Sequence, residues 1–321
     1  MKPLRVALVH RGNPRRYARI DGQFAYPVPE FVWEHVEVHK SGQNLDINKW
    51  QGKYDLVWLD PGKYSFLNIL SPKAEKHKVK SVYWALFPTL TQGHLNKDQA
   101  RAKWNANLVL LDHDNVNRWE GLGVPVRRLG YSVNERYYYD RGLERDIDVN
   151  FACYREYSHE RPALDAWLRG YCERRGWTYT SGSGYVGEDY AVVMARSKVM
   201  VHILRTPLTR PPRMFDTAAC GTAMLSNPMP VVSGEEWVAG EHYRVFNKPF
   251  SAGVSDGQRN PPQVTMDDAV CSEIITQLDW LLTGDNWRGV AETAKEYVLS
   301  CHTWQHRATE LRQIVHEELG L

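Results

Sequence analysis

Cysteine is scarce in this chain and never closely spaced. The five cysteines, at positions 153, 172, 220, 271 and 301, are scattered, odd in number and include no Cys-x-x-Cys pair. This distribution argues against a zinc site and favours a reduced, cytoplasmic setting. Long apolar runs are missing too, since none approaches the roughly 20 residues that a membrane span needs. The apolar segment at the N-terminus is too short for a signal peptide and predicts a first strand instead.

Internal repeats and low-complexity tracts are also missing, which excludes a solenoid. A length of 321 residues with 43% hydrophobic residues suits two globular domains. The net charge of +2 is unevenly divided: residues 1–150 hold 23 Lys/Arg and 17 Asp/Glu, a net of +6, and the remainder has a net of −4. The basic first half attracts polyanions, although its charge stays within the range of ordinary domains.

Short apolar runs typical of β-strands alternate with helical stretches along the whole chain. The predicted strands are residues 4–9, 56–59, 79–84, 108–111, 126–129, 148–152, 177–180, 199–203 and 224–226. The predicted helical segments are residues 97–104, 116–122, 161–175, a stretch ending near 196, 267–282 and 287–319, the last with a break near His302. This alternation predicts an α/β protein with doubly wound parallel sheets, which bind ligands at the carboxyl ends of their strands.

The domain boundary is predicted from a change in composition. Residues 134–145 are polar and rich in tyrosine without periodicity, so we place the linker there. The predicted domains are residues 1–145 and 146–301, followed by a C-terminal helix, 302–321, that returns to the first domain. A stretch rich in Gly, Ser and Pro at 251–262 predicts an exposed loop.

The most informative motif spans residues 210–225, where a basic loop and an Ala-rich helix precede a helix-ending Gly221 and an apolar strand. The N-terminus of such a helix favours an anion, and Arg210 and Arg213 would add charge-assisted contacts to phosphate. Asp216, placed in the first turn, can accept hydrogen bonds from a ribose diol. These features suit a nucleotide diphosphate. The alternative is a helix-start carboxylate beside a solvated basic loop.

Several segments, in the right order along nearly the whole chain, resemble two-domain GT-B glycosyltransferases of the spore-maturation type and related group-one families. The segments are residues 54–58, 82–88, 106–112, 117–134, 146–155, 213–221 and 302–307. The resemblance implies two Rossmann-like domains that face a cleft, the first for the acceptor and the second for a nucleotide-sugar. The chain departs from the family pattern at Asp216 and Leu208, where relatives carry Glu. It also departs at Ala85–Pro88, where relatives often have His or Asp before the proline.

The resemblance also implies a donor site in the second domain. Arg213, supported by Arg155, would contact the diphosphate of a UDP-sugar, and Gly12 would let the first domain approach it. Glu188 and Tyr190 follow a Gly-rich loop near the expected nucleobase, or are loop surface. No Asp-x-Asp pair is placed for a metal ion, so no metal cofactor is expected. For Arg161 the alternatives are a donor contact and a residue that only starts a helix, and for His302 and Thr303 a packing or hinge role is favoured over catalysis.

The loop after the first strand holds the densest basic and aromatic cluster of the chain. Four arginines, interleaved with aromatic residues, suit contacts with a phosphate backbone: Arg11, Arg15, Arg16 and Arg19. The alternative is a loop whose charge only aids solubility. Asp21 in this loop is a candidate base that deprotonates an acceptor hydroxyl, and Asp60 at the end of another strand is its rival.

The sequence therefore predicts an enzyme, a nucleotide-sugar-dependent glycosyltransferase. The acceptor is either 5-hydroxymethylated pyrimidine in DNA, such as that of a viral genome, or a glycan or small glycoside. Hydroxymethylated DNA would bring its phosphates to the basic loop and a flipped base to the cleft. A hypothesis from another class is a non-catalytic nucleotide- or nucleic-acid-binding protein that has kept the fold.

Overall fold

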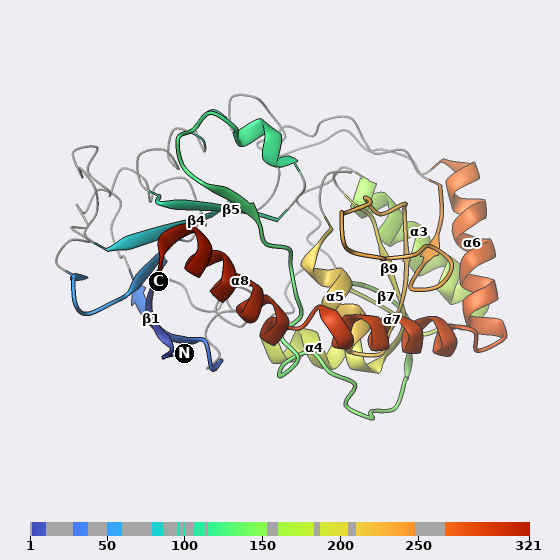
Figure 1. Cartoon of the computed structure of the whole chain (residues 1–321). Coiled ribbons are helices and arrows are strands. Elements are labelled where there is room, and N and C mark those ends of the chain that lie inside the picture. Colours follow the sequence, from blue (N-terminus) through green and yellow to red (C-terminus); the bar gives the residue numbers. More distant parts are fainter. Residues whose placement is uncertain are drawn as a thin grey trace. The chain divides into compact units, whose positions relative to one another are not determined.

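The structure, a computed structural model, describes residues 2–10, 28–37, 50–59, 79–85, 96, 99, 106–112, 115–152, 160–182, 187–204, 210–247 and 267–321 (Figure 1). Its internal contacts divide the chain into two compact units. Unit 1 comprises residues 1–131 and 304–321, and unit 2 comprises residues 132–303. Among the described residues, no helix has both the length and the hydropathy to cross a membrane.

Unit 1 is built on a six-stranded parallel sheet with the order β2-β1-β3-β4-β5-β6. Its strands are β1 (Leu4–His10), β2 (Phe31–Glu37), β3 (Leu56–Leu59), β4 (Lys80–Ala85), β5 (Leu108–Leu111) and β6 (Val126–Arg128), with a 3-10 helix, η3 (Asn115–Trp119), before the last. The apolar runs predicted from the sequence form these strands because both faces of a parallel sheet are buried.

The C-terminal helix α8 (Trp304–Leu319) belongs to unit 1, beside its strands (Figure 1). An aromatic row joins helix and sheet: Trp304 packs on Trp33 of β2, and Trp33 meets Trp58 of β3 edge-on. Gln305 donates to Glu30 at 3.0 Å, immediately before β2. The amphipathic C-terminal segment is therefore stabilised by aromatic burial against the sheet.

Unit 2 is built on a five-stranded parallel sheet with the order β11-β10-β9-β7-β8. Its strands are β7 (Ile147–Ala152), β8 (Tyr179–Gly182), β9 (Ser197–His202), β10 (Ala223–Ser226) and β11 (Arg244–Val245). Its helices are α3 (Glu160–Arg175), α4 (Gly187–Arg196), α5 (Pro212–Ala219), α6 (Asp268–Thr283) and α7 (Trp287–Cys301).

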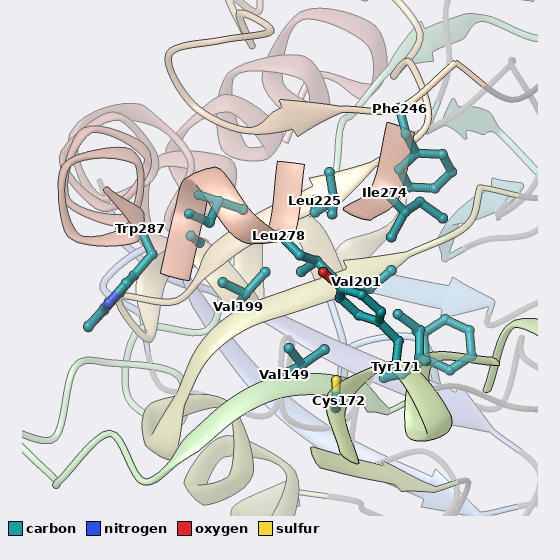
Figure 2. Packing of buried hydrophobic residues seen from close by; sticks show 14 of the residues in the cluster. Val149, Tyr171, Cys172, Val199, Val201, Leu225, Phe246, Ile274, Leu278 and Trp287 are labelled. Carbon is teal, nitrogen blue, oxygen red and sulfur yellow. The ribbon is translucent and has the colours of Figure 1, made fainter. Parts of the chain in front are cut away.

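The two faces of this sheet differ in chemistry. Val149, Val199, Val201 and Leu225 point from the strands into an apolar core with side chains of α3, α6 and α7 (Figure 2). Since side chains alternate along a strand, the residues between them face the other side. That second face carries polar groups, among them the buried His202 at the end of β9.

The predicted α/β fold is confirmed, with local differences. Strands β2 and β11 were not predicted. Residues 115–119, which overlap the helical segment predicted at 116–122, form a 3-10 helix instead. The predicted break near His302 is observed, since α7 ends at Cys301 and α8 starts at Trp304. The predicted exposed loop at 251–262 lies outside the described residues.

The segment predicted as a linker, residues 134–145, is part of unit 2 in the division by contacts. Arg145 explains why: its guanidinium donates to the carbonyl oxygens of Ser197 at 2.9 Å and Cys220 at 2.8 Å. Arg141 binds Glu188 of α4 at 2.6 Å. The division by contacts thus lies at 131/132 and 303/304, compared with the predicted 145/146 and 301/302.

Candidate functional site

The sheet of unit 2 has a topological switch point between β7 and β9. The first strand, β7, has the second strand, β8, on one side and the third, β9, on the other. The chain leaves β7 towards α3 and β9 towards α5, and these helices cover different faces of the sheet. Ligands of open α/β sheets bind beyond the carboxyl ends of the strands at such a point.

Helix α5 begins at this edge with two prolines. Pro211 is its N-cap and Pro212 its first residue, and the side chain of Pro211 makes no capping hydrogen bond. Proline at the first position is preorganised for a helix, and an uncapped N-terminus favours an anion. Because the helix begins at Pro212, Asp216 lies beyond the first turn, which corrects the position expected from the sequence. Its side chain is buried, with 1% of the residue exposed.

Arg213 is the most unusual group at this edge. It is 6% exposed, and its Nε donates to the hydroxyl of Tyr190 at 2.9 Å. Its Nη1 lies 3.4 Å from Nδ1 of His202. Neither of these partners is a carboxylate. No carboxylate among the described residues forms an ion pair with Arg213. Burial of such a cation costs several kcal/mol unless an anion joins it.

Arg210 has a different environment. Its Nη1 lies 2.6 Å from a carboxylate oxygen of Glu235, and both side chains are buried. Its other nitrogens donate to the carbonyl oxygens of Pro230 and Glu235, each at 3.1 Å. The guanidinium thus ties the segment after β10 to the start of α5. The phosphate contact predicted for Arg210 stays a prediction, and these bonds give the residue a structural role.

Glu188 and Tyr190 lie on α4, in its first and second turns, rather than in a loop. Glu188 is exposed and pairs with Arg141, whereas Tyr190 is 2% exposed and holds Arg213. Tyr138 packs edge-on against Tyr190, with the ring centroids 5.9 Å apart. The structure therefore brings Tyr190 to the predicted diphosphate contact. The nucleobase role predicted for both residues stays a prediction.

Three further polar residues gather at this edge, and the sequence interpretation missed two of them. Arg161 of α3, a weak candidate from the sequence, donates to the carbonyl oxygen of Ile203 at 3.3 Å. On the other side of the same peptide group, the N–H of Leu204 donates to Oδ1 of Asn227 at 2.8 Å. His202 and Asn227 were missed, although each stands at or just past the end of an apolar strand. That position was the available signal.

Cys220 follows α5 at the end of the helix away from this edge, and it does not offer a nucleophile. Burial, together with the charge of Asp216, raises the pKa of the Cys220 thiol well above its ordinary value, so the thiol stays protonated and inert. Across the part of the chain that the structure describes, no group of three His, Cys, Asp or Glu side chains is arranged to hold a metal ion.

The remaining predicted site residues lie outside the described residues. They are the predicted donor contacts Gly12 and Arg155, the candidate bases Asp21 and Asp60, and the basic loop residues Arg11, Arg15, Arg16 and Arg19. Their predicted roles stay predictions. The departure from the family pattern at Leu208 lies there as well.

A sequence model of the glycosyl transferase-like family matches residues 145–313, more than half of the chain. The chain belongs to this family. The matched region begins with Arg145, includes all of α5, and ends within α8. A search of curated protein sequences finds no significant match.

Solved structures show the fold of this family member. HepE from Anabaena, in complex with UDP and glucose, has a TM-score of 0.61 and 10% identity, covering 98% of this chain and all of HepE. A glycosyltransferase from Rickettsia africae has a TM-score of 0.61 and 10% identity, covering 99% of both chains. Sucrose-phosphate synthase from Thermosynechococcus elongatus has a TM-score of 0.59 and 12% identity, covering 99% of both chains.

These likenesses confirm the GT-B fold predicted from the sequence: two units, each with a parallel sheet and interleaved helices. The family match likewise confirms the predicted kinship with glycosyltransferases. The more detailed resemblance to the spore-maturation type stays a prediction.

Proposed function

We propose that this protein is a glycosyltransferase that moves a sugar from a UDP-sugar to an acceptor hydroxyl. The observation that carries the proposal is Arg213, a buried cation at the carboxyl edge of β9 and the start of α5 with which no described carboxylate forms an ion pair. A diphosphate supplies the missing negative charge. The family match and the UDP complexes of HepE support this choice of ligand.

The proposed mechanism places charge stabilisation at Arg213. Negative charge grows on the diphosphate as the bond to the sugar breaks, so a fixed cation there lowers the barrier. Tyr190 and His202 contact the guanidinium from two sides, so it is already in position and does not have to move during the reaction. Asp216 accepts hydrogen bonds from the ribose diol in this proposal. The acceptor base is Asp21 or Asp60, as predicted from the sequence.

The test compares Arg213→Gln with the parent by calorimetric titration of UDP. We expect UDP binding to weaken by about 2–4 kcal/mol, or about 30- to 1000-fold, as for other preorganised anion sites. The free protein should lose little stability, because the substitution also removes a buried charge. Unchanged affinity for UDP in Arg213→Gln would contradict the assignment.

A matched control replaces the other buried arginine of the motif. Arg210→Gln combined with Glu235→Gln removes both members of an ion pair and leaves no lone charge behind. We expect this double variant to bind UDP like the parent. A loss of UDP binding would instead support the phosphate contact predicted for Arg210.

For the acceptor we propose, from the sequence, a polyanion: DNA with hydroxymethylated pyrimidine, contacted by Arg11, Arg15, Arg16 and Arg19. The alternative acceptor is a glycan or small glycoside. Transfer of radiolabelled sugar to hydroxymethylated duplex, compared with unmodified duplex and a panel of glycosides, separates the two. Slow hydrolysis of the UDP-sugar by the protein alone distinguishes either enzyme from a non-catalytic binder, which hydrolyses none.

A further inference from the structure

Asn227 is the first residue after β10, and it is 1% exposed. The register pairs Ser226 of β10 with His202 of β9, so Asn227 lies at the carboxyl edge that carries the candidate site. Its Oδ1 accepts from the N–H of Leu204 at 2.8 Å and lies 3.5 Å from the hydroxyl of Ser226.

These contacts determine which way the amide points. A backbone N–H can only donate, so the atom that faces Leu204 must be the oxygen. The amide nitrogen of Asn227 consequently points elsewhere. It is buried, and among the described residues no group accepts a hydrogen bond from it. An enclosed donor without an acceptor costs about 1–3 kcal/mol, and native structures keep few of them.

The neighbouring peptide group is held from both sides. The carbonyl oxygen of Ile203 accepts from Arg161 of α3, and the N–H of Leu204 binds Asn227. Because Leu204 is held in this way, the amide of Asn227 is fixed with its nitrogen turned away from Leu204 and unpaired among the described residues. His202, which contacts Arg213, directly precedes this peptide group. The unpaired nitrogen therefore belongs to the same edge as the proposed diphosphate contact.

Asn150 shows what a purely structural asparagine looks like in this sheet. It is 0% exposed, and its Oδ1 accepts from the N–H of Ala152 at 2.7 Å, much as Asn227 binds Leu204. Its amide nitrogen, however, donates to the hydroxyl of Ser197 at 3.1 Å. Both ends of the Asn150 amide are satisfied within the protein, whereas no described residue accepts a hydrogen bond from the amide nitrogen of Asn227.

We propose that Asn227 is a donor-binding residue whose amide nitrogen donates a hydrogen bond to an oxygen of the nucleotide-diphosphate sugar. This inference rests on the proposed function. The oxygen belongs either to the diphosphate or to a hydroxyl of the transferred sugar, since both accept hydrogen bonds.

The experiment titrates UDP and UDP-glucose into the parent, Asn227→Asp and Asn150→Asp. Aspartate keeps an oxygen for Leu204 and replaces the donating nitrogen with an acceptor. We expect Asn227→Asp to bind UDP-glucose about 10- to 100-fold more weakly, the range for loss of a hydrogen bond to a charged or polar ligand. Asn150→Asp should lower the unfolding temperature and leave the affinity unchanged. If Asn227→Asp fails to fold, Asn227→Ala removes the amide donor without adding charge.

The outcomes separate the two hypotheses. Weaker binding of UDP as well as UDP-glucose assigns the contact to the UDP portion, and weaker binding of UDP-glucose alone assigns it to the sugar. Parent-like affinity for both ligands in the Asn227 variants overturns the inference and leaves the proposed function standing. If the parent itself binds neither UDP nor UDP-glucose, the proposed function fails, and the role of Asn227 with it.

Discussion

Gly221 offers the sharpest test of how unit 2 is held together. It follows α5 in the left-handed region, at φ +69°, and its N–H donates to the carbonyl oxygen of Ala218 at 2.8 Å. A Cβ at this position would lie 2.8 Å from Nη2 of Arg145 and 3.0 Å from Oδ2 of Asp140. That guanidinium donates to five groups, including the carbonyl oxygens of Ser197 and Cys220. A methyl group must therefore displace an arginine that joins several segments.

Gly176 provides a matched control that measures only the cost of a left-handed backbone conformation for alanine. It follows α3 at φ +67°, and a Cβ there would meet nothing within 4 Å. Gly176→Ala should cost about 1–2 kcal/mol, the strain of a left-handed non-glycine residue. Gly221→Ala should cost the same plus about 1–3 kcal/mol for overpacking against Arg145 and Asp140. The difference between the two losses of stability gives the cost of placing a methyl group against Arg145 and Asp140.

The assay is urea unfolding of both variants and the parent, followed by circular dichroism. Both glycines belong to unit 2, so the comparison does not depend on how unit 1 unfolds. Equal losses for Gly176→Ala and Gly221→Ala would refute the reasoning, because the clash with Arg145 would then have no energetic consequence. A gain in stability for Gly176→Ala would refute the backbone argument.

Two further predictions concern protons and salt. Burial lowers the pKa of the His242 imidazole below its ordinary 6.5, although the negative charges of Glu241 and Glu236 act in the opposite direction. As the pH falls, His242 therefore takes up a proton in the unfolded chain before it does so in the folded protein. Stability should fall as the pH drops from about 6.5 towards the folded-state pKa, and His242→Gln should lessen that loss in urea titrations. For the acceptor, log affinity for hydroxymethylated duplex should fall about 0.9 per log salt for each neutralised phosphate. Replacing Arg15 and Arg16 by Ala should flatten this slope by up to about two units, whereas salt-independent binding by the parent would favour a glycan.

Much of the sheet of each unit could be predicted from local pattern. Apolar runs such as residues 56–59 and 108–111 became strands with the predicted bounds, because strands buried on both faces need continuous apolar sequence. Strand β2 escaped prediction because Glu34 interrupts its apolar residues. Only some of its side chains are buried, and Val32 is exposed.

The candidate site was predictable only in part. The motif at 210–225 indicated an anion site at the start of a helix, and Gly221 indicated where that helix ends; the helix and its end are confirmed. The separate environments of Arg210 and Arg213 could not be predicted, because their partners Glu235 and Tyr190 lie 25 and 23 residues away along the chain.

The sequence by itself determined the two α/β units, their apolar strands and the position of a basic helix start, since these depend on local periodicity and on backbone chemistry within a few residues. Only the tertiary structure decided which of the two arginines lies beside a carboxylate among the described residues. Arg210 meets a carboxylate, Arg213 meets a phenol and an imidazole, and Asn227 retains a buried donor. Burial and pairing are properties of the folded surroundings, because segments distant in sequence supply the partners.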